Sequence, residues 1–258
     1  MADAKTFVAN SPVWLDMASK DAAASRDFYS KLFGWKVEVA GPEAGGYALA
    51  KVGGKDVAGI GPAQDPNAPT AWSLYIGTRD AAATAKKVEE AGGKVVVPPF
   101  DVLDQGRMAV FQDPAGAFIS VWEPKNMFGA EIMGKEASYG WAELNARGFD
   151  RDEAFYTKVF GWTTKKSPMG EGQPDYTEFL LDGQSIAGGM EMNPMVPKDV
   201  PSYWMVYFTV ADLDKSHRKA VELGSHEMLA PREFPGGRFS ILTDPQGAAF
   251  GLLTMRQA

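Results

Sequence analysis

The sequence predicts an α+β protein built from two tandem halves, each of which contains two βαβββ modules. One observation is a repeated octapeptide, FYSKLFGW at residues 28–35 and FYTKVFGW at residues 155–162. Another is the longer match between GRMAVFQDPAGAF (106–118) and GRFSILTDPQGAAF (237–250). Repeats of this length indicate a duplicated domain rather than a solenoid unit. The third is the order of strand and helix patterns, which occurs twice within each half.

The first module begins with the alternating stretch VWLDMAS at residues 13–19, which is typical of a strand. Residues 21–34 then follow a helical period, and Asp21 and Gly34 are suitable caps for its two ends. Glycine and proline separate three short predicted strands, near residues 36–40, 46–52 and 56–61.

The second module restarts the same pattern at residue 72. Its expected elements are a strand at 72–78, a helix at 80–91, and strands near 94–97, 107–112 and 117–122. DPAG at 113–116 is expected to turn between the last two strands, because proline favours the second turn position and glycine the fourth. WSLYIGTRDAAATAKKVEEAGG (72–93) corresponds to WMVYFTVADLDKSHRKAVELGS (204–225), so the second half repeats this module too.

The octapeptide is interpreted as scaffold rather than chemistry. Phe28, Leu32 and Phe33 lie at helical spacing and are expected to bury against a sheet, and Trp35 is expected to begin the next strand. On this pattern the first domain spans residues 8–124 and the second spans 137–256. A linker at 125–136, rich in glycine and of mixed polarity, joins them.

Composition excludes several classes of function. The formal net charge is −7, from 26 basic and 33 acidic residues, which argues against a nucleic-acid or anionic-membrane surface. Cysteine is absent, which excludes disulfides, thiolate nucleophiles and cysteine metal sites. The N-terminus lacks the pattern of a secretory signal, and no apolar run approaches a membrane span. We therefore expect a cytoplasmic protein, with export without a signal peptide left open.

A strand, a helix ending in FYxxxxGW and a closing strand announced by DPxG resemble the vicinal-oxygen-chelate superfamily. That superfamily includes glyoxalase I, bleomycin-resistance proteins, fosfomycin-resistance enzymes and extradiol dioxygenases. The resemblance covers almost the whole chain twice and is strongest for the tandem two-domain actinobacterial type, which includes mycobacterial culture-filtrate antigens. It implies that the two modules of each half form a curled mixed sheet around a cavity, with helices outside.

The resemblance also implies where metal-using members would place their ligands. Counted from the repeated motifs, these positions are Trp14, Gly59, Ser73 and Ser120 in the first half, and Trp141, Gly188, Met205 and Gly251 in the second. None is a usual ligand of a catalytic divalent ion. His217 and His226 lie outside these strands, and a surface or capping role is expected for both. We therefore expect no metal at the inherited site and no cofactor.

Strand alternation predicts which side chains replace those ligands. The face opposite the helices is expected to carry Trp14, Asp16, Ser73, Tyr75, Ser120 and Trp122 in the first half, and Trp141, Glu143, Asn145, Met205 and Tyr207 in the second. Aromatic walls with few polar groups are typical of a small-molecule pocket. The alternative interpretation is that Trp14 and Trp141 fill the interior as core residues.

Asp16 and Glu143 occupy equivalent places, two residues after the tryptophans. A carboxyl buried beside aromatic rings has a raised pKa and could act as a general acid or base. The alternative is a structural carboxylate paired with an arginine, for which Arg107 and Arg238 are candidates.

Three functions follow from these observations. The first is binding of a small aromatic metabolite or antibiotic in a metal-free, aromatic-lined cavity. The second is a glyoxalase-, dioxygenase- or hydroxylase-type enzyme, a lyase or oxygenase, using a non-inherited metal site or acid–base chemistry by Asp16 or Glu143. The third is a protein-interaction module. The expected partner is a small-molecule ligand, and the chain is expected to be a monomer acting as a pseudo-dimer, or a weak homodimer.

Overall fold

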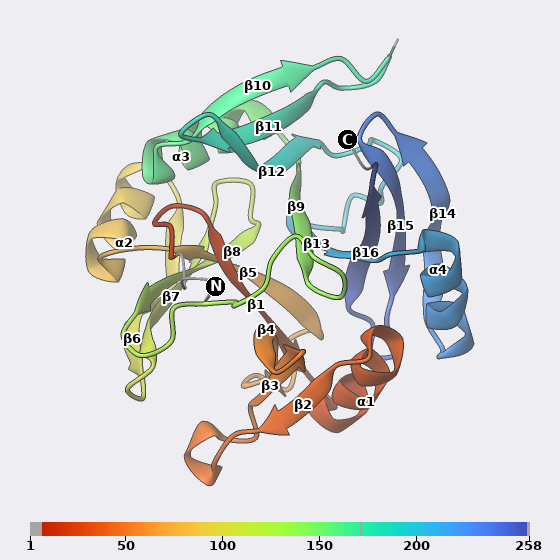
Figure 1. Ribbon diagram of the computed structural model, residues 1–258. Helices are drawn as coiled ribbons and strands as arrows, with labels where there is room; N and C mark the ends of the chain where they lie inside the picture. Colours follow the sequence, from red (N-terminus) through yellow and green to blue (C-terminus); the bar gives the residue numbers. More distant parts are fainter. Residues whose placement is uncertain (1–6, 171, 257–258) are drawn as a thin grey trace. The chain divides into compact units, whose positions relative to one another are not determined.

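The computed structural model describes residues 7–170 and 172–256, and its elements follow the order βαβββ four times (Figure 1). The first half contains β1 (Pro12–Ser19), α1 (Ala22–Phe33), β2 (Lys36–Val39), η1 (Pro42–Ala44), β3 (Ala48–Val52), β4 (Lys55–Pro62), β5 (Ala71–Gly77), α2 (Ala81–Glu90), β6 (Lys94–Val102), β7 (Gly106–Gln112) and β8 (Phe118–Pro124). The second half contains β9 (Tyr139–Ala146), α3 (Phe149–Phe160), β10 (Thr163–Ser167), β11 (Tyr176–Leu181), β12 (Gln184–Glu191), β13 (Tyr203–Thr209), α4 (Leu213–Glu222), β14 (His226–Phe234), β15 (Gly237–Thr243) and β16 (Ala249–Met255). The predicted order is confirmed.

Strand β6 departs most from expectation, since it continues well beyond the predicted residues 94–97. Its pairing with β7 is irregular between Val97 and Phe100. Pro98 and Pro99 lie in this interval and lack the backbone N–H that a regular ladder uses. Because of these two prolines, the sequence pattern did not predict the second part of the strand.

The strands form two eight-stranded sheets, in the orders β2-β3-β4-β1-β5-β8-β7-β6 and β10-β11-β12-β9-β13-β16-β15-β14. In every module the first strand lies parallel to the last, and the remaining neighbours run antiparallel. The parallel registers pair Asp16 with Gly59, Tyr75 with Ser120, Glu143 with Gly188, and Tyr207 with Gly251. These two mixed sheets confirm the predicted fold class.

Contacts divide the chain into two compact units, each of which combines a module of the first half with one of the second. The α1/α4 unit contains Leu15–Ser73, Ala130–Trp141 and the chain from Met205 onward. The α2/α3 unit contains the chain up to Trp14, Leu74–Gly129 and Ala142–Trp204. Inside each unit the two helices that give it its name pack against each other.

The core of the α1/α4 unit is built around Tyr29, the tyrosine of the first octapeptide. Its side chain is fully buried, and its hydroxyl donates to Oδ2 of Asp244 at 3.0 Å and accepts from Nε1 of Trp72 at 2.9 Å. The ring stacks on that of Trp35, and Phe208 packs against Trp35 with a centroid distance of 5.7 Å. The octapeptide is therefore core, as predicted.

The α2/α3 unit repeats this arrangement with the second octapeptide. The Tyr156 hydroxyl donates to Oδ2 of Asp113 at 2.9 Å and accepts from Nε1 of Trp204 at 2.7 Å. Trp162 stacks on Tyr156 at 5.6 Å, and its Nε1 donates to the carbonyl of Asn10. Because buried polar groups are costly without partners, these bonds fix how the two modules of a unit fit together.

The helix ends explain most of the predicted boundaries. Asp21 caps α1 by accepting from the backbone N–H of Ala24, and Gly34 ends the helix in the left-handed conformation, with φ 72°. Helix α3 differs because Gly148, at φ 81°, has no side chain to offer as a cap. Glu191, the last residue of β12, supplies a capping side chain in its place.

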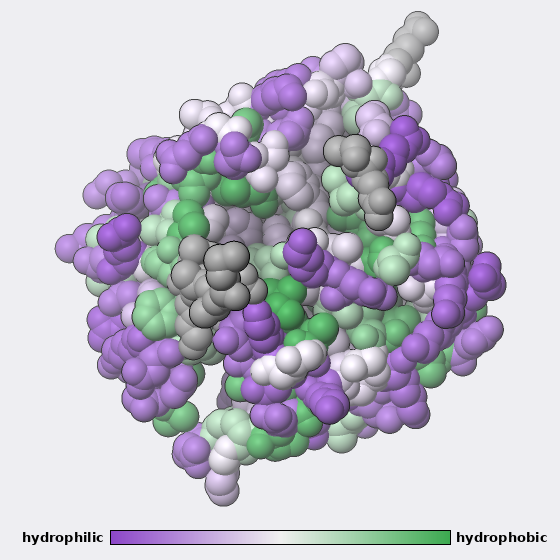
Figure 2. Space-filling model, in the orientation of Figure 1, coloured by the Kyte–Doolittle hydropathy of each residue, from purple (hydrophilic) through white to green (hydrophobic). Residues whose placement is uncertain are grey.

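Within the octapeptide, Phe28 and Leu32 are buried, while Phe33 is half-buried and Trp35 precedes β2. The outer surface around α4 and β14 is hydrophilic in Figure 2, in keeping with the exposed lysines and arginine of α4. Of the helices in the described part of the chain, none combines the length and apolar character needed to cross a membrane.

Candidate functional site

The residues that the sequence assigns to a ligand face lie in both compact units. Six belong to the α2/α3 unit, namely Trp14, Tyr75, Ser120, Trp122, Glu143 and Asn145. The α1/α4 unit holds the others, Asp16, Ser73, Trp141, Met205 and Tyr207. Trp14, Tyr75, Ser120, Trp122, Met205 and Tyr207 are buried, whereas Asp16, Ser73, Trp141, Glu143 and Asn145 are half-buried.

Hydrogen bonds to the helices establish which face of each strand these residues occupy. The indoles of Trp72 and Trp204 bond tyrosines of α1 and α3, so these tryptophans point toward the helices. Successive side chains of a strand alternate between its faces. Tyr75 and Tyr207, three residues further along β5 and β13, therefore lie on the face turned away from the helices, as predicted.

Two aromatic residues lie on the predicted ligand face of β5 and β8 in the α2/α3 unit. The Tyr75 hydroxyl lies 3.9 Å from Sδ of Met108. The Trp122 indole donates to the carbonyl of Met127 at 2.8 Å, and its ring occupies the space that a Cβ atom on Gly106 would need. Gly106 thus allows the indole to lie close to the backbone of the neighbouring strand.

The equivalent face in the α1/α4 unit has a different set of rings. Tyr207 packs over Gly251, whose missing Cβ leaves room for the ring. Phe239 lies edge-on to Tyr207 with a centroid distance of 6.1 Å, and Phe234 lies edge-on to Phe239 at 6.0 Å. Edge-to-face geometry is the favourable one for such pairs.

A tyrosine lies over a glycine beside each predicted carboxylate. Asp16 on β1 pairs in register with Gly59 on β4. A Cβ atom on Gly59 would fall on the hydroxyl oxygen of Tyr47, and one on Gly61 would lie 2.8 Å from ring atom Cδ2 of the same residue. The Tyr47 ring therefore covers both glycines on the face that Asp16 shares.

The second half repeats this arrangement around Glu143. Glu143 pairs in register with Gly188, and a Cβ atom on Gly188 would fall on the hydroxyl of Tyr176. Oε1 of Glu143 accepts a hydrogen bond from Nδ2 of Asn145 at 3.2 Å. Tyr203 begins β13, the strand next to β9, and burial, followed by the negative charge of Glu143, raises the pKa of its phenol.

The residues at the inherited ligand positions do not fit a catalytic metal ion. Gly59, Gly188 and Gly251 have no side chain, and a tyrosine fills the space into which a ligand would project. Within residues 7–170 and 172–256, no three His, Asp or Glu side chains converge in a group that could hold an ion. Divalent catalytic ions need several such donors at one point.

The two arginines offered as partners for the carboxylates have other partners. Arg107 bonds Oδ1 of Asp101 at 2.9 Å, and Arg238 bonds Asp214 at 2.7 Å. In each case the acidic partner belongs to the same module as the arginine, and the pairing of these arginines with Asp16 and Glu143 stays a prediction.

The expected surface or capping role of His217 is wrong, because this residue lies in the interior of α4 and its ring is buried. Its Nε2 lies 2.7 Å from Oε2 of Glu227. His226 begins β14 and is exposed, as expected.

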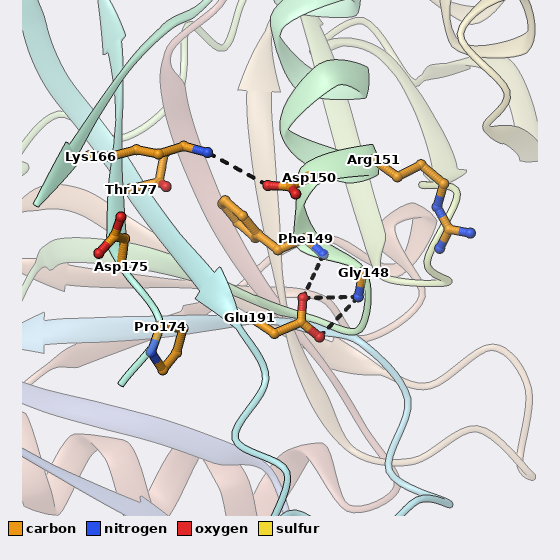
Figure 3. Close-up of a pocket in the computed structure, with 9 residues that line it drawn as sticks. All are labelled: Gly148, Phe149, Asp150, Arg151, Lys166, Pro174, Asp175, Thr177 and Glu191. Atoms are coloured by element: carbon orange, nitrogen blue, oxygen red, sulfur yellow. Dashed lines mark hydrogen bonds and ion pairs between the residues drawn. The ribbon is translucent and has the colours of Figure 1, made fainter. Parts of the chain in front are cut away.

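A pocket of about 550 Å³ lies at the start of α3 (Figure 3). Glu191 points at the helix N-terminus and accepts from the backbone N–H groups of Gly148, at 3.0 Å, and Phe149, at 2.8 Å. Lys166 reaches across to Asp150, at 3.6 Å. Phe149 fills the space beside Gly189, whereas Tyr176 covers the adjacent Gly188, so this pocket lies on the helix side of β12, opposite the predicted ligand face.

Sequence reasoning missed Tyr47, Tyr176 and Tyr203. A usable signal was present for the first two: each tyrosine stands twelve residues before the glycine that it covers, at equivalent places in the repeat. Strand alternation alone could not reveal this role, because each tyrosine covers a glycine of a different strand and its position depends on how the strands pair.

Comparison with known proteins places these features in a family. The model of the Glyoxalase/Bleomycin resistance protein/Dioxygenase superfamily matches residues 11–121 and 138–252. The anthracycline biosynthesis protein DnrV of Streptomyces peucetius is 39% identical, over 97% of this chain and 95% of its own. CFP32 of Mycobacterium tuberculosis, whose name describes a glyoxylase, is 37% identical over 94% of each chain.

Solved structures show the same fold at low identity. The Mn(II)-bound glyoxalase from Novosphingobium aromaticivorans superposes with a TM-score of 0.65 at 19% identity, covering 95% of this chain and 82% of that one. The 2,3-dioxygenase LapB from Pseudomonas sp. KL28 gives 0.64 at 14% identity, with coverages of 96% and 92%.

Proposed function

The chain belongs to the Glyoxalase/Bleomycin resistance protein/Dioxygenase superfamily, and from this premise we propose that it binds a small aromatic organic molecule without using a metal. The observation that carries the proposal is that three of the eight inherited ligand positions, Gly59, Gly188 and Gly251, are glycines covered by tyrosine rings. A site that has aromatic rings where metal ligands would lie favours a flat, apolar molecule.

The aromatic faces supply the contacts that such a ligand needs. Tyr75 and Trp122 lie on the ligand face of the α2/α3 unit, and Tyr207 and Phe239 lie on that of the α1/α4 unit. Because the glycine beneath each ring has no side chain, the ring can lie close to the backbone. Stacking on such rings adds to the free energy gained by burying apolar surface.

The relatives support an aromatic natural product as the ligand class. Two of them, DnrV and DauV, are named as anthracycline biosynthesis proteins, and each covers nearly the whole of this chain. Anthracyclines carry a flat, fused-ring quinone. A ligand of that shape suits a wall of indole and phenol rings.

Acid–base turnover of the bound molecule is the second candidate, and the surroundings of Glu143 favour it. The carboxylate lies beside Asn145 and near Tyr203, a set of groups that could hold or move a proton at a ligand oxygen. The glyoxylase name of CFP32 is compatible with this activity.

Fluorescence titration with aromatic quinones tests the proposal. Quenching of tryptophan emission by 1,4-dihydroxyanthraquinone should be saturable, and Trp122→Leu should weaken binding by roughly fivefold to tenfold. Leucine is the natural residue at the equivalent Leu253, so this variant should fold. Unchanged affinity in Trp122→Leu, or no binding by the wild type, would contradict the assignment of this face.

A further inference from the structure

The two carboxylate sites are equivalent by sequence but differ in the polar groups around them. In the first half, the positions that correspond to Asn145 and Tyr203 are Ala18 and Ala71. The second half has therefore gained an amide and a phenol beside its carboxylate. Two such changes around one side chain indicate that Glu143 and Asp16 do not perform the same task.

The geometry of β9, β11 and β12 brings the second set together. Glu143 and Gly188 are register partners on neighbouring strands, which lie about 4.8 Å apart. The Tyr176 hydroxyl stands over Gly188, where that residue's side chain would be, so it lies across from Glu143 on the same face. A carboxylate and a phenol at this separation are within reach of one ligand oxygen, or of two adjacent ones.

Asn145 and Tyr203 are the other two members of this set. Asn145 donates to Oε1 of Glu143 at 3.2 Å, which orients the carboxylate. Tyr203 begins β13, the strand next to β9, and by alternation its side chain lies opposite Trp204, on the face turned away from the helices. Glu143, Asn145, Tyr176 and Tyr203 are all half-buried, so part of each residue remains accessible.

We propose that Glu143, Asn145, Tyr176 and Tyr203 form a hydrogen-bonding site for the oxygen atoms of a hydroxylated quinone or phenolic ligand. The inference rests on the proposed function and specifies which end of the ligand is recognised and by which half. Glu143 accepts from a ligand hydroxyl, and a tyrosine hydroxyl donates to the adjacent ketone oxygen. A hydroxyl beside a carbonyl is the ligand chemistry that matches one acceptor next to donors.

A nearby carboxylate provides the matched control. Glu178 on β11 is the register partner of Gly188 from the other side. Its oxygens are held by the Ser185 hydroxyl and by Lys165, whose Nζ lies 3.6 Å from Oε1. Glu178→Gln therefore removes the same charge as Glu143→Gln from the same strand neighbourhood, at a carboxylate bonded to two residues outside the proposed site.

The test compares two probes, 1,4-dihydroxyanthraquinone and unsubstituted anthraquinone, by calorimetric or fluorescence titration of the full chain. Tyr176→Phe and Glu143→Gln should each weaken binding of the hydroxylated probe about tenfold and change binding of anthraquinone less than twofold. Asn145→Ala, which restores the first-half residue, should act in the same direction. Glu178→Gln should leave both affinities within twofold.

The outcomes separate this inference from the proposed function. If the wild type binds both probes but Tyr176→Phe and Glu143→Gln affect them equally, or not at all, the hydrogen-bonding site is refuted and aromatic binding stands. If the wild type binds neither probe, the proposed function is refuted and the site with it. Thermal unfolding of each variant checks that the fold is retained.

Discussion

The hydroxyl of Tyr29 donates a 3.0 Å hydrogen bond to Oδ2 of Asp244, which joins the octapeptide of the first half to the DPQG turn of the second. Tyr156 and Asp113 form the reciprocal bond at 2.9 Å. Each repeated motif therefore has the other motif as its partner, from the opposite half of the sequence. This relationship explains why both motifs occur twice: each compact unit needs one copy of each.

Tyr29→Phe should lower the free energy of unfolding by about 1–3 kcal/mol, because it leaves Oδ2 of Asp244 and Nε1 of Trp72 buried without their partner. Tyr156→Phe should cost a similar amount through Asp113 and Trp204. Urea unfolding followed by fluorescence measures both. A loss below about 0.5 kcal/mol in either variant would show that these bonds do not hold the modules together.

Asp152 should make stability depend on pH. Burial, followed by the neighbouring charge of Asp113, raises the pKa of Asp152 from 3.8 to about 7. Both carboxylates accept from the same backbone N–H, that of Ala115, at 3.0 Å. Between these pKa values the native carboxyl keeps a proton that the unfolded chain has released, so its contribution to stability falls as the pH rises and the penalty is complete above about pH 7.

Asp152→Asn removes this titration while keeping an acceptor for Ala115. Relative to the wild type, the variant should gain roughly 1–4 kcal/mol of unfolding free energy between pH 4 and pH 8. Ser25 occupies the equivalent position in α1, so Asp152→Ser offers a second neutral variant with a natural precedent. A difference between variant and wild type that does not change with pH would contradict the assignment.

Glu191 should stabilise α3 from outside the helix. Glu191→Ala removes the acceptor for Gly148 and Phe149 and should cost about 0.5–2 kcal/mol, with faster amide exchange in the first turn of α3. Asp21→Ala is the matched variant, since Asp21 caps α1 from within its own sequence. Equal exchange in α3 of Glu191→Ala and wild type would show that the cap contributes nothing.

Gly188→Ala should displace Tyr176, because the added methyl group would fall on its hydroxyl. The displacement should cost about 1–3 kcal/mol and weaken binding of a hydroxylated quinone. Gly183→Ala is the control. Gly183 lies in a nearby turn with φ 77°, and no atom lies close to the position of its added methyl group, so this variant measures the loss of a glycine alone. Retention of full affinity in Gly188→Ala would separate Tyr176 from the ligand site.

The sequence predicted the order of elements because hydrophobic period and turn residues act locally. Apolar and polar residues alternate in VWLDMAS, and residues 22–33 follow a helical period. DPAG favours a turn independently of the rest of the chain. Because these signals are local, they did not predict that each module packs with a module from the other half of the sequence. Nothing near Tyr29 shows that its hydroxyl bonds Asp244, since that bond depends on how the modules pack.

Alternation predicted the faces of residues within single strands, but not contacts from one strand to the next. Glu143 and Tyr75 follow from alternation, but Tyr176, the first residue of β11, covers a glycine of the neighbouring strand β12. His217 was expected in a surface or capping role, yet it lies on the buried side of α4, which packs against β14, β15 and β16. Pairing register and helix rotation are set by tertiary packing, which a single sequence shows only indirectly.

Calorimetric titration with 1,4-dihydroxyanthraquinone, before and after exhaustive treatment with a chelator, tests the central claim most directly. The account predicts saturable binding whose affinity is unchanged by chelator and by added Mn²⁺, Fe²⁺ or Ni²⁺, and which falls about tenfold in Tyr176→Phe. Binding that disappears with the chelator and returns with one of these ions would contradict it.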